Sequence, residues 1–361
     1  MTRRPTLDTV ARALGVSRMT VSNAYNKPDQ LSAQTRDAVL ATARSLGYSG
    51  PSAAGRSLRR GMSGTVGVLL TERLPYAFTD PGTIAFLHGL ATELADARRA
   101  LQLIPSDGET DSTLALVRGA IVDAFVITGL DEADPVVSAV LARRLPLVTA
   151  GSPRLPGVPF VSVANTPAAY MAAQALIALG HTRIGIVTYR AQLRTGRDGV
   201  AIAVHQSFHD RWIGYEQALT AAALAEGGSC TRAAPTNSRA GGREAALHML
   251  SVAPELRPTA VLAMTDVLAL GAIDAADELG LAVPDDVSIV GFDDIEEARR
   301  SSPPLTTIRQ GLFEQGLNAA ALALAMMAGE RAQADEFPTE LVVRASTSPP
   351  AALATDRRTA A

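Results

Sequence analysis

Residues 10–26 read V-A-R-A-L-G-V-S-R-M-T-V-S-N-A-Y-N, and this stretch predicts two short helices that meet at Gly15. In the first of these helices, apolar side chains recur at the spacing of one helical face: Leu7, Val10, Ala11 and Leu14. Thr6 can cap the first helix, Gly15 permits the sharp turn, and the Ser17 hydroxyl can accept from the N–H groups that open the second helix. The stretch therefore predicts a helix-turn-helix unit.

The second of these helices has an apolar side and a polar side. Val21 and Ala24 lie on the apolar side. The opposite arc carries Arg18, Met19, Ser22 and Asn23. Arginine can pair with guanine, asparagine with adenine and methionine with a thymine methyl group, while Thr20 and Ser22 suit phosphate. The helical pattern alone leaves an ordinary helical hairpin equally open.

The formal net charge of −3 is unevenly distributed along the chain. Residues 1–61 contain ten Lys+Arg and three Asp+Glu, a charge of +7, whereas the remainder contains 23 basic and 33 acidic residues, a charge of −10. A small basic head on an acidic body predicts that the head alone meets a polyanion. The alternative is a solvated charged surface.

The composition is that of a globular protein with room for two or three domains. The chain has 361 residues, 47% of them hydrophobic and 19% charged. Cys230 is the single cysteine, so no intramolecular disulfide is possible. The first residues lack the apolar core of a secretion signal, and no apolar run reaches membrane length. We therefore expect a cytoplasmic protein without membrane contact.

A third helix and a linker follow the first two helices. Residues 32–46 predict a helix with four inward side chains, Val39, Leu40, Ala43 and Leu46, ended by Gly47, with Tyr48 packing back on it. Residues 50–61 are rich in Gly and Ser, which is typical of a tether. Leu58 stands among Arg56, Arg59 and Arg60 in this tether, and an exposed leucine beside arginines suits a wedge inserted into a minor groove.

From Thr65 onward, short apolar runs alternate with helix-length segments. The runs predicted as strands are 65–71, 122–128, 145–150, 183–188, 259–264 and 287–292. The segments predicted as helices are 84–99, 166–179, 211–225, 239–250 and 266–279. This alternation predicts parallel sheets covered on both faces, and its length predicts two stacked Rossmann-like subdomains.

The motifs A-R-A-L-G-V-S-R-M-T-V-S-N, L-S-A-Q-T-R-D-A-V, L-G-Y and P-S-A-A-G-R-S-L of residues 6–61 resemble the DNA-binding head and hinge of LacI/GalR transcription regulators, and the resemblance continues to about residue 348. It implies an α/β fold in which a three-helix head and a hinge helix precede two subdomains of the periplasmic-binding-protein type, crossed by the chain three times. The implied boundaries are 1–49 for the head, 50–61 for the hinge, 62–348 for the core and 349–361 for a loose tail.

The same resemblance implies how DNA is bound. A homodimer would read a palindromic operator at the nucleoid, its hinge helices would fold on DNA, and Leu58 would pry open the central base step. The residues expected at the DNA are Thr6, Leu7, Ser17, Arg18, Met19, Thr20, Ser22, Asn23, Asn26, Arg56, Leu58 and Arg59.

Ligands of parallel sheets sit beyond the carboxyl ends of the strands, which directs attention to the polar residues found there. By resemblance, Arg211 matches the arginine that clamps the family's effector, and Asp293 matches a carboxylate that contacts effector hydroxyls. The residues expected at a sugar-like effector are Thr71, Phe78, Arg211, Thr265, Asp266 and Asp293. A salt bridge between Arg211 and Asp293 across a closed cleft remains the alternative. Gly151 departs from the family, which often has an acidic residue there, so the effector's identity stays open.

Four aromatic residues could stack on a ligand, although each such residue is more often part of a core or an interface: Tyr76, Phe78, Phe160 and Trp212. His205 and His209 are four residues apart but lack an evident third metal ligand, and His181 is more easily explained as structural. No nucleophile motif is present, and no cofactor is expected. The sequence thus predicts an effector-controlled transcriptional regulator, most simply a repressor. The alternatives are an enzyme or a solute-capture protein on the same two-lobed scaffold.

Overall fold

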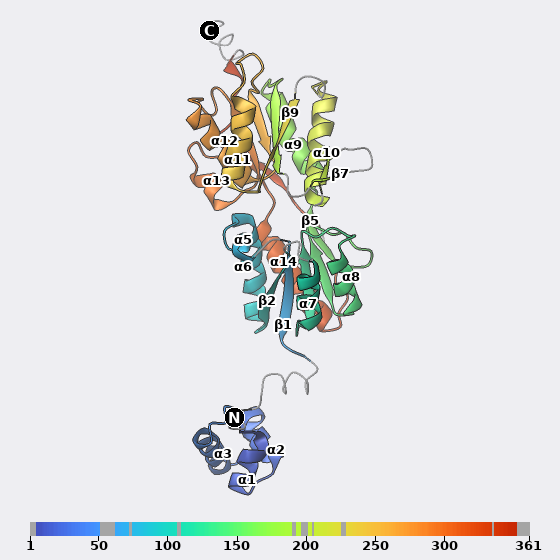
Figure 1. Cartoon of the computed structure of the whole chain (residues 1–361), viewed down its shortest axis with the longest axis vertical. Helices are drawn as coiled ribbons and strands as arrows, with labels where there is room; N and C mark the ends of the chain where they lie inside the picture. Colours follow the sequence, from blue (N-terminus) through green and yellow to red (C-terminus); the bar gives the residue numbers. More distant parts are fainter. Residues whose placement is uncertain are drawn as a thin grey trace. The chain divides into compact units, whose positions relative to one another are not determined.

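The computed structural model describes residues 5–50, 62–71, 74–106, 110–189, 193–195, 201–203, 206–224, 229–333 and 336–351. The chain divides into two compact units, Met1–Gly64 and Thr65–Ala361, drawn in Figure 1. None of the helices in the described part of the chain is both long and apolar enough to span a membrane.

The first unit is a three-helix head. Its elements are α1 (Leu7–Leu14), α2 (Arg18–Asn26), the 3-10 turn η1 (Pro28–Gln30) and α3 (Ala33–Ser45). Val10, Val21 and Val39, one from each α-helix, are buried together in its core. Tyr48 packs back on this core as predicted. Leu46 was predicted to face inward, and this is wrong: it lies just beyond the last residue of α3 and is 37% exposed, because Gly47 turns the chain there with φ 71°.

The second unit contains two lobes, each built on a six-stranded sheet (Figure 1). The strands of the first lobe are β1 (Thr65–Leu70), β2 (Ala100–Pro105), β3 (Ala124–Thr128), β4 (Leu147–Ala150), β5 (Phe160–Val163) and β13 (Glu336–Phe337). Its helices are α5 (Leu74–Ala77), α6 (Pro81–Asp96), α7 (Thr110–Gly119), α8 (Pro135–Ala142) and α14 (Leu312–Met327).

The second lobe repeats this architecture. Its strands are β6 (Ile184–Tyr189), β9 (Ser229–Ala234), β10 (Ala260–Ala263), β11 (Ser288–Asp293), β12 (Thr306–Arg309) and β14 (Glu340–Val342), and a small pair is formed by β7 (Leu193–Thr195) and β8 (Ala201–Ala203). Its helices are α9 (Asn165–Ala178), α10 (Gln206–Ala221), α11 (Arg239–Leu250), α12 (Asp266–Glu278) and α13 (Glu296–Arg300). Every predicted strand and helix of the core is found, with helix ends shifted by up to five residues.

The strand order explains why the strands are apolar throughout. The orders are β13-β5-β4-β3-β1-β2 in the first lobe and β14-β12-β11-β10-β6-β9 in the second, parallel except for β14. In β1, Val66 and Val68 contribute to one core cluster while Leu69 contributes to another, on the opposite face of the sheet. Both faces are therefore buried, as parallel sheets require.

The chain passes between the lobes three times, as the resemblance implied. It leaves the first lobe after β5, returns after β12 into α14, and leaves again between β13 and β14. These crossings all use strands at one edge of each sheet, where β5 and β13 neighbour each other, as do β12 and β14. The lobes are thus tied together along one side of the space between them.

Candidate functional site

The joint between α1 and α2 has the geometry of a helix-turn-helix. Thr6 is the N-cap of α1, and its backbone N–H donates to the Thr9 hydroxyl at 3.1 Å. Gly15 has φ 65°, which glycine adopts without strain. The Ser17 hydroxyl accepts from the backbone N–H of Thr20 at 3.0 Å and so caps α2. The predicted capping and turn residues are therefore confirmed as features of the fold.

The exposed side of α2 presents three different side chains to solvent. Met19 is 68% exposed, so its apolar side chain is accessible from solvent. Arg18 forms an exposed ion pair with Asp8 at 2.9 Å, a contact that a stronger partner can replace. Asn23 donates weakly to Gln30 at 3.4 Å. Their chemistry is suited to base edges, while their contacts with DNA stay a prediction.

Ser22 does not belong to this exposed face. It is only 7% exposed, and the Asn26 side-chain amide donates to its carbonyl oxygen at 3.0 Å and to its hydroxyl at 3.3 Å. The helical wheel placed Ser22 beside Asn23, but the structure buries Ser22 together with Val21 and Ala24. Asn26 itself is exposed. The expected hinge contacts of Arg56, Leu58 and Arg59 lie outside the described residues.

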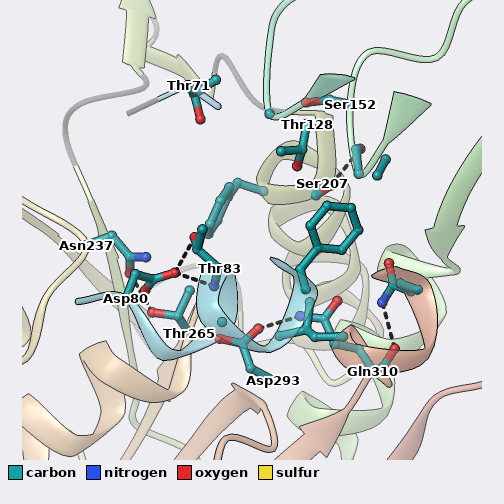
Figure 2. A pocket seen from close by; sticks show the side chains of 18 of the residues that line it. Thr71, Asp80, Thr83, Thr128, Ser152, Ser207, Asn237, Thr265, Asp293 and Gln310 are labelled. Carbon is teal, nitrogen blue, oxygen red and sulfur yellow. Dashed lines mark hydrogen bonds between the residues drawn. The ribbon is translucent and has the colours of Figure 1, made fainter. Parts of the chain in front are cut away.

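The structural candidate for a small-molecule site is a cavity of about 200 Å³ between the two lobes. It lies at the carboxyl ends of the strands, as expected for parallel sheets. Side chains of both lobes line it, and those with polar groups or rings include Thr71, Tyr76, Asp80, Thr83, Phe86, Thr128, Ser152, Ser162, Asn165, Ser207, Phe208, Arg211, Asn237, Thr265, Asp293, Gln310 and Gln315. Figure 2 shows Thr71, Thr128 and Ser152 on one side of this pocket and Asp293 and Gln310 on the other.

Arg211 is the one cation among the described residues that line the pocket, and its guanidinium is already held in place. It is 4% exposed, donates to the Asn165 side-chain oxygen at 2.9 Å and to the Met264 carbonyl at 2.6 Å, and lies 3.6 Å from the centre of the Phe292 ring. Its Nη1 is 3.6 Å from the Asp293 carboxylate. The buried charge is thereby balanced and fixed in orientation.

The alternative salt bridge is therefore present, but it does not close the cleft. Arg211 on α10 and Asp293 at the end of β11 both belong to the second lobe, so their pair joins nothing across it. Both residues still line the pocket. Burial raises the pKa of Asp293 well above its ordinary value, with Arg211 opposing the shift. The Gln310 amide donates to the same carboxylate at 2.5 Å.

Asp266 was predicted at the effector, but the structure places it beneath the pocket. It is fully buried and accepts from the Thr307 hydroxyl at 2.5 Å and from the Ile295 backbone N–H at 3.0 Å. Burial raises the pKa of Asp266 to about 6. Thr265, one residue earlier, does line the pocket and is the N-cap of α12. At the start of α12, Thr265 therefore faces the pocket while Asp266 faces the protein interior.

Phe78 also lies outside the pocket, because it is 65% exposed on the turn after α5. Phe160 faces the Arg154 guanidinium at 4.3 Å, and Trp212 packs on the core of the second lobe. Of the four aromatic candidates, Tyr76 alone is among the lining residues. Phe78, the one aromatic residue expected at the effector, was therefore wrongly placed there, whereas Trp212 has the core role that was the more frequent alternative.

His181 has the structural role expected for it. It is 2% exposed, its Nδ1 is 2.9 Å from the Thr259 hydroxyl, and its Nε2 is 2.9 Å from the Ser348 carbonyl oxygen. Burial lowers its pKa below the ordinary value. Within the described residues, no three His, Cys, Asp or Glu side chains are grouped as a metal site, and His205 lies outside that part of the chain.

Comparisons with known proteins agree with this geometry. The profile of bacterial regulatory proteins of the lacI family matches residues 6–50, and that of the periplasmic binding protein-like domain matches residues 173–347. The HTH-type transcriptional regulator IpsA of Corynebacterium glutamicum is 39% identical over 333 residues, which cover 89% of this chain and 91% of that protein. The chain belongs to the LacI family of bacterial regulators.

Two further LacI-family relatives extend this similarity over nearly the whole chain. An HTH-type transcriptional regulator of Mycobacterium tuberculosis is 36% identical over 362 residues, covering 97% of this chain and 98% of that one. The solved complex of the regulator CelR with cellobiose is 28% identical in sequence, with a TM-score of 0.68. The match covers 95% of this chain and 100% of that chain. These relatives are transcriptional regulators, and the LacI-family chain is accordingly a DNA-binding transcriptional regulator and not an enzyme.

Several pocket residues of this LacI-family chain could not be found from sequence motifs. Phe86 lies in the second turn of α6 and Phe208 in the first turn of α10, and from sequence a ring in such a helix is interpreted as part of the core. Asn237 and Gln310 lie in connections after β9 and β12, which were not predicted as strands. Asp80 was recoverable: it directly precedes Pro81, the pattern of a capped helix start, and its carboxylate accepts from the Thr83 N–H at 2.8 Å.

Proposed function

We propose that this regulator is a repressor that binds a palindromic operator as a homodimer and is controlled by an uncharged, polyhydroxylated ligand of the sugar class in the inter-lobe pocket. It would act in the cytoplasm, at the nucleoid. In this proposal residues 1–49 bind DNA, 50–61 form the hinge, 62–348 bind the effector and dimerise, and 349–361 form a tail.

The ligand class rests on the charges and hydroxyl groups of the pocket. The cation of the described lining, Arg211, is already neutralised by Asp293, and Asp80 adds a further carboxylate from the first lobe. A phosphate or carboxylate group on the ligand would meet no further cation among the described lining residues and would approach two carboxylates. Hydroxyl groups, in contrast, can donate to Asp80 and Asp293 and accept from Thr, Ser and Asn side chains.

The comparison with CelR is consistent with this ligand class, since that regulator was solved with cellobiose. Phe86 and Phe208 supply two rings to the lining, and a sugar ring has apolar C–H faces that pack against aromatic rings. The proposed effector contacts in this chain are Thr71, Arg211, Thr265 and Asp293, together with Asp80 and Asn237.

The proposed DNA contacts follow from the exposed face of α2. Arg18, Met19 and Asn23 would read base edges in the major groove. Thr6, Ser17, Thr20 and Asn26 would bind phosphate, with Leu7 beside them at the start of α1. Arg56, Leu58 and Arg59 would enter the minor groove, a role proposed from the sequence. Ser22 is withdrawn from this set because it is buried.

Native mass spectrometry of the purified full-length protein, followed by calorimetry, tests the ligand class. We expect neutral sugars or polyols to co-purify or to bind from a panel, and their phosphorylated counterparts to bind at least tenfold more weakly. Asp293→Asn should weaken binding at least tenfold, whereas Asp277→Asn, an exposed carboxylate on α12, should not change it. Preferential binding of a phosphorylated or carboxylated compound would contradict the proposal.

A further inference from the structure

One hydrogen-bonded contact joins the two lobes at the edge of the pocket. The Tyr76 hydroxyl, from α5 of the first lobe, donates to the backbone carbonyl of Asn237 in the second lobe at 2.9 Å. The Asn237 side-chain amide donates back to the same hydroxyl oxygen at 3.0 Å. Tyr76 is thus engaged twice by a single residue of the other lobe.

Asn237 continues this contact into the second lobe. Its side-chain oxygen accepts from the Thr265 hydroxyl at 2.7 Å, and that hydroxyl also accepts from the Leu268 N–H at 3.4 Å at the start of α12. Both ends of the Asn237 amide are therefore engaged, which fixes its orientation. Tyr76, Asn237 and Thr265 all line the pocket, so a bound molecule touches the same chain of hydrogen bonds that joins the lobes.

The Tyr76–Asn237 contact lies near the sheet edges opposite the three crossings. The three crossings use β5, β12, β13 and β14, at one edge of each sheet. Tyr76 follows β1, next to the opposite edge of the first sheet, and Asn237 follows β9, the opposite edge strand of the second. A bond far from the crossings resists opening about them more than a bond close to them does.

A second hydrogen bond between the lobes lies nearer the crossings than the Tyr76–Asn237 contact does. The Ser207 hydroxyl on α10 donates to the Gly151 carbonyl at 2.8 Å. Gly151 follows β4, which pairs with the crossing strand β5. Figure 2 shows Ser207 and Asn237 on different sides of the pocket. The Ser207 contact lies nearer the crossings and therefore serves as an internal comparison.

We propose that Tyr76, Asn237 and Thr265 form a latch that holds the lobes closed, and that Asn237 is the positioning residue through which pocket occupancy changes the relation of the lobes. The inference rests on the proposed function, because the occupant is the proposed effector. A ligand hydroxyl at Thr265 or Asn237 shares the hydrogen-bonding groups that hold Tyr76, so occupancy and closure are coupled.

Pulsed electron spin resonance on the ligand-free full chain tests closure directly. Spin labels at exposed Ala91 on α6 and Glu244 on α11, in a Cys230→Ala background, report the distance between the lobes beside the latch. Dilution with unlabelled chain keeps one labelled copy in each dimer. Tyr76→Phe removes only the hydroxyl, and Tyr170→Phe removes a hydroxyl that contacts Gln174 within α9, which makes it the matched control.

We expect Tyr76→Phe to add a longer-distance population at an unchanged melting temperature, and Tyr170→Phe to leave the distribution as in the parent. Ser207→Ala should give a smaller change than Tyr76→Phe. If Tyr76→Phe folds poorly, Asn237→Ala replaces it with the same expectation. A parental distance distribution in both latch variants would overturn the proposal.

The proposed coupling between the latch and DNA binding is tested by measuring operator affinity. With an operator obtained by in vitro selection, Tyr76→Phe should change ligand-free affinity at least threefold and Tyr170→Phe should not. A longer inter-lobe distance with parental affinity would overturn the coupling. Failure to select any preferred DNA would contradict the proposed function instead, while the distance measurement would still decide the latch.

Discussion

Asp293 and Asp294 are neighbours in the chain with opposite electrostatic surroundings. Asp293 faces the pocket, and burial raises its pKa. Burial also acts on Asp294, but hydrogen bonds from Arg344, Arg309 and Arg299 lower its pKa below the ordinary value. Both residues have positive φ, 140° and 60°, which side-chain-bearing residues seldom adopt. This backbone turns one carboxylate to the pocket and the other to the arginines that hold β11, β12 and the segment after β14 together.

This divergence shows where residue-level prediction from sequence stops. The rule that ligands lie beyond strand ends correctly directed attention to Thr265 and Asp293, whereas Asp266 lies beneath the pocket. It could not tell which of two adjacent carboxylates turns inward, because that depends on the backbone angles of the turn. The same limit applies to Ser22, which was assigned to the exposed arc from the helical wheel. In the folded head Ser22 is buried together with Val21 and Ala24 of the same helix.

Asp266→Asn should remove a pH dependence of stability. The folded protein holds the Asp266 proton more tightly than the unfolded chain, with a pKa of about 6 against an ordinary value of 3.8. Its contribution to the free energy of unfolding is therefore greatest at low pH and is lost as the pH rises from about 4 to about 6. Relative to the variant, the parent should lose roughly 2 kcal/mol between pH 4 and pH 7.

Urea denaturation of both proteins at several pH values measures this difference. Asp277→Asn is the matched control, because it removes a carboxylate from an exposed position on the same helix. Its stability difference from the parent should stay constant over the range. A constant difference for Asp266→Asn as well would show that the buried carboxylate does not titrate as inferred.

Arg18→Ala should weaken operator binding and relax the preference at one base pair. Arg18 is exposed at the start of α2, and its partner Asp8 is exposed too, so its removal leaves the head intact. We expect a loss of about 1–3 kcal/mol in specific binding. In vitro selection and fluorescence anisotropy would check this. Arg44→Ala is the control: Arg44 is exposed on α3, and its removal takes away the same charge but should leave the base preference unchanged.

At the level of elements, glycines set the close approach of three helix pairs in the core. Added Cβ atoms at Gly89 and Gly316 would lie 2.0 Å and 2.1 Å from backbone oxygens of the partner helix in the α6 and α14 pair. The same holds for Gly214 between α10 and α9 and for Gly271 between α12 and α11. From sequence, a glycine inside a helix reads only as a weak helix former. Its packing role becomes visible once the partner helix is known.

Gly89→Ala should therefore destabilise the first lobe although alanine is the better helix former. We expect a loss of about 1–3 kcal/mol, because the methyl group meets backbone that cannot move aside locally. Gly119→Ala, where the added Cβ has open space, is the matched control and should be neutral or slightly stabilising. Thermal unfolding followed by circular dichroism compares the two. Equal midpoints would contradict the packing argument.

The pattern of elements was predictable where hydrophobic runs were continuous. The central strands β1, β3, β4, β6, β10 and β11 all appear where expected. The strands not predicted, such as β5, β9 and β12, are short or carry Ser, Thr and Arg, and they lie toward the sheet edges where one side has fewer neighbours. Because Asn237 and Gln310 follow such strands, the pocket was predicted only in part.

At the level of the whole molecule, the chain combines a DNA-binding head with a two-lobed core in which a pocket lies between lobes joined by three crossings. The family membership shows what the protein does, and the pocket indicates how it is controlled. The proposed control requires that ligand binding between the lobes changes DNA affinity. Its coupling free energy should lie in the usual range of about 1–3 kcal/mol, or roughly 5- to 150-fold in affinity.

The most direct test is the affinity of the full-length chain for its selected operator, measured by fluorescence anisotropy with and without the sugar or polyol identified by calorimetry. We predict that the ligand weakens operator binding at least fivefold in the parent protein. Asp293→Asn should bind the operator as tightly as the parent without ligand and respond to the same ligand concentration by less than twofold. A parent affinity that the bound ligand leaves unchanged would contradict the account.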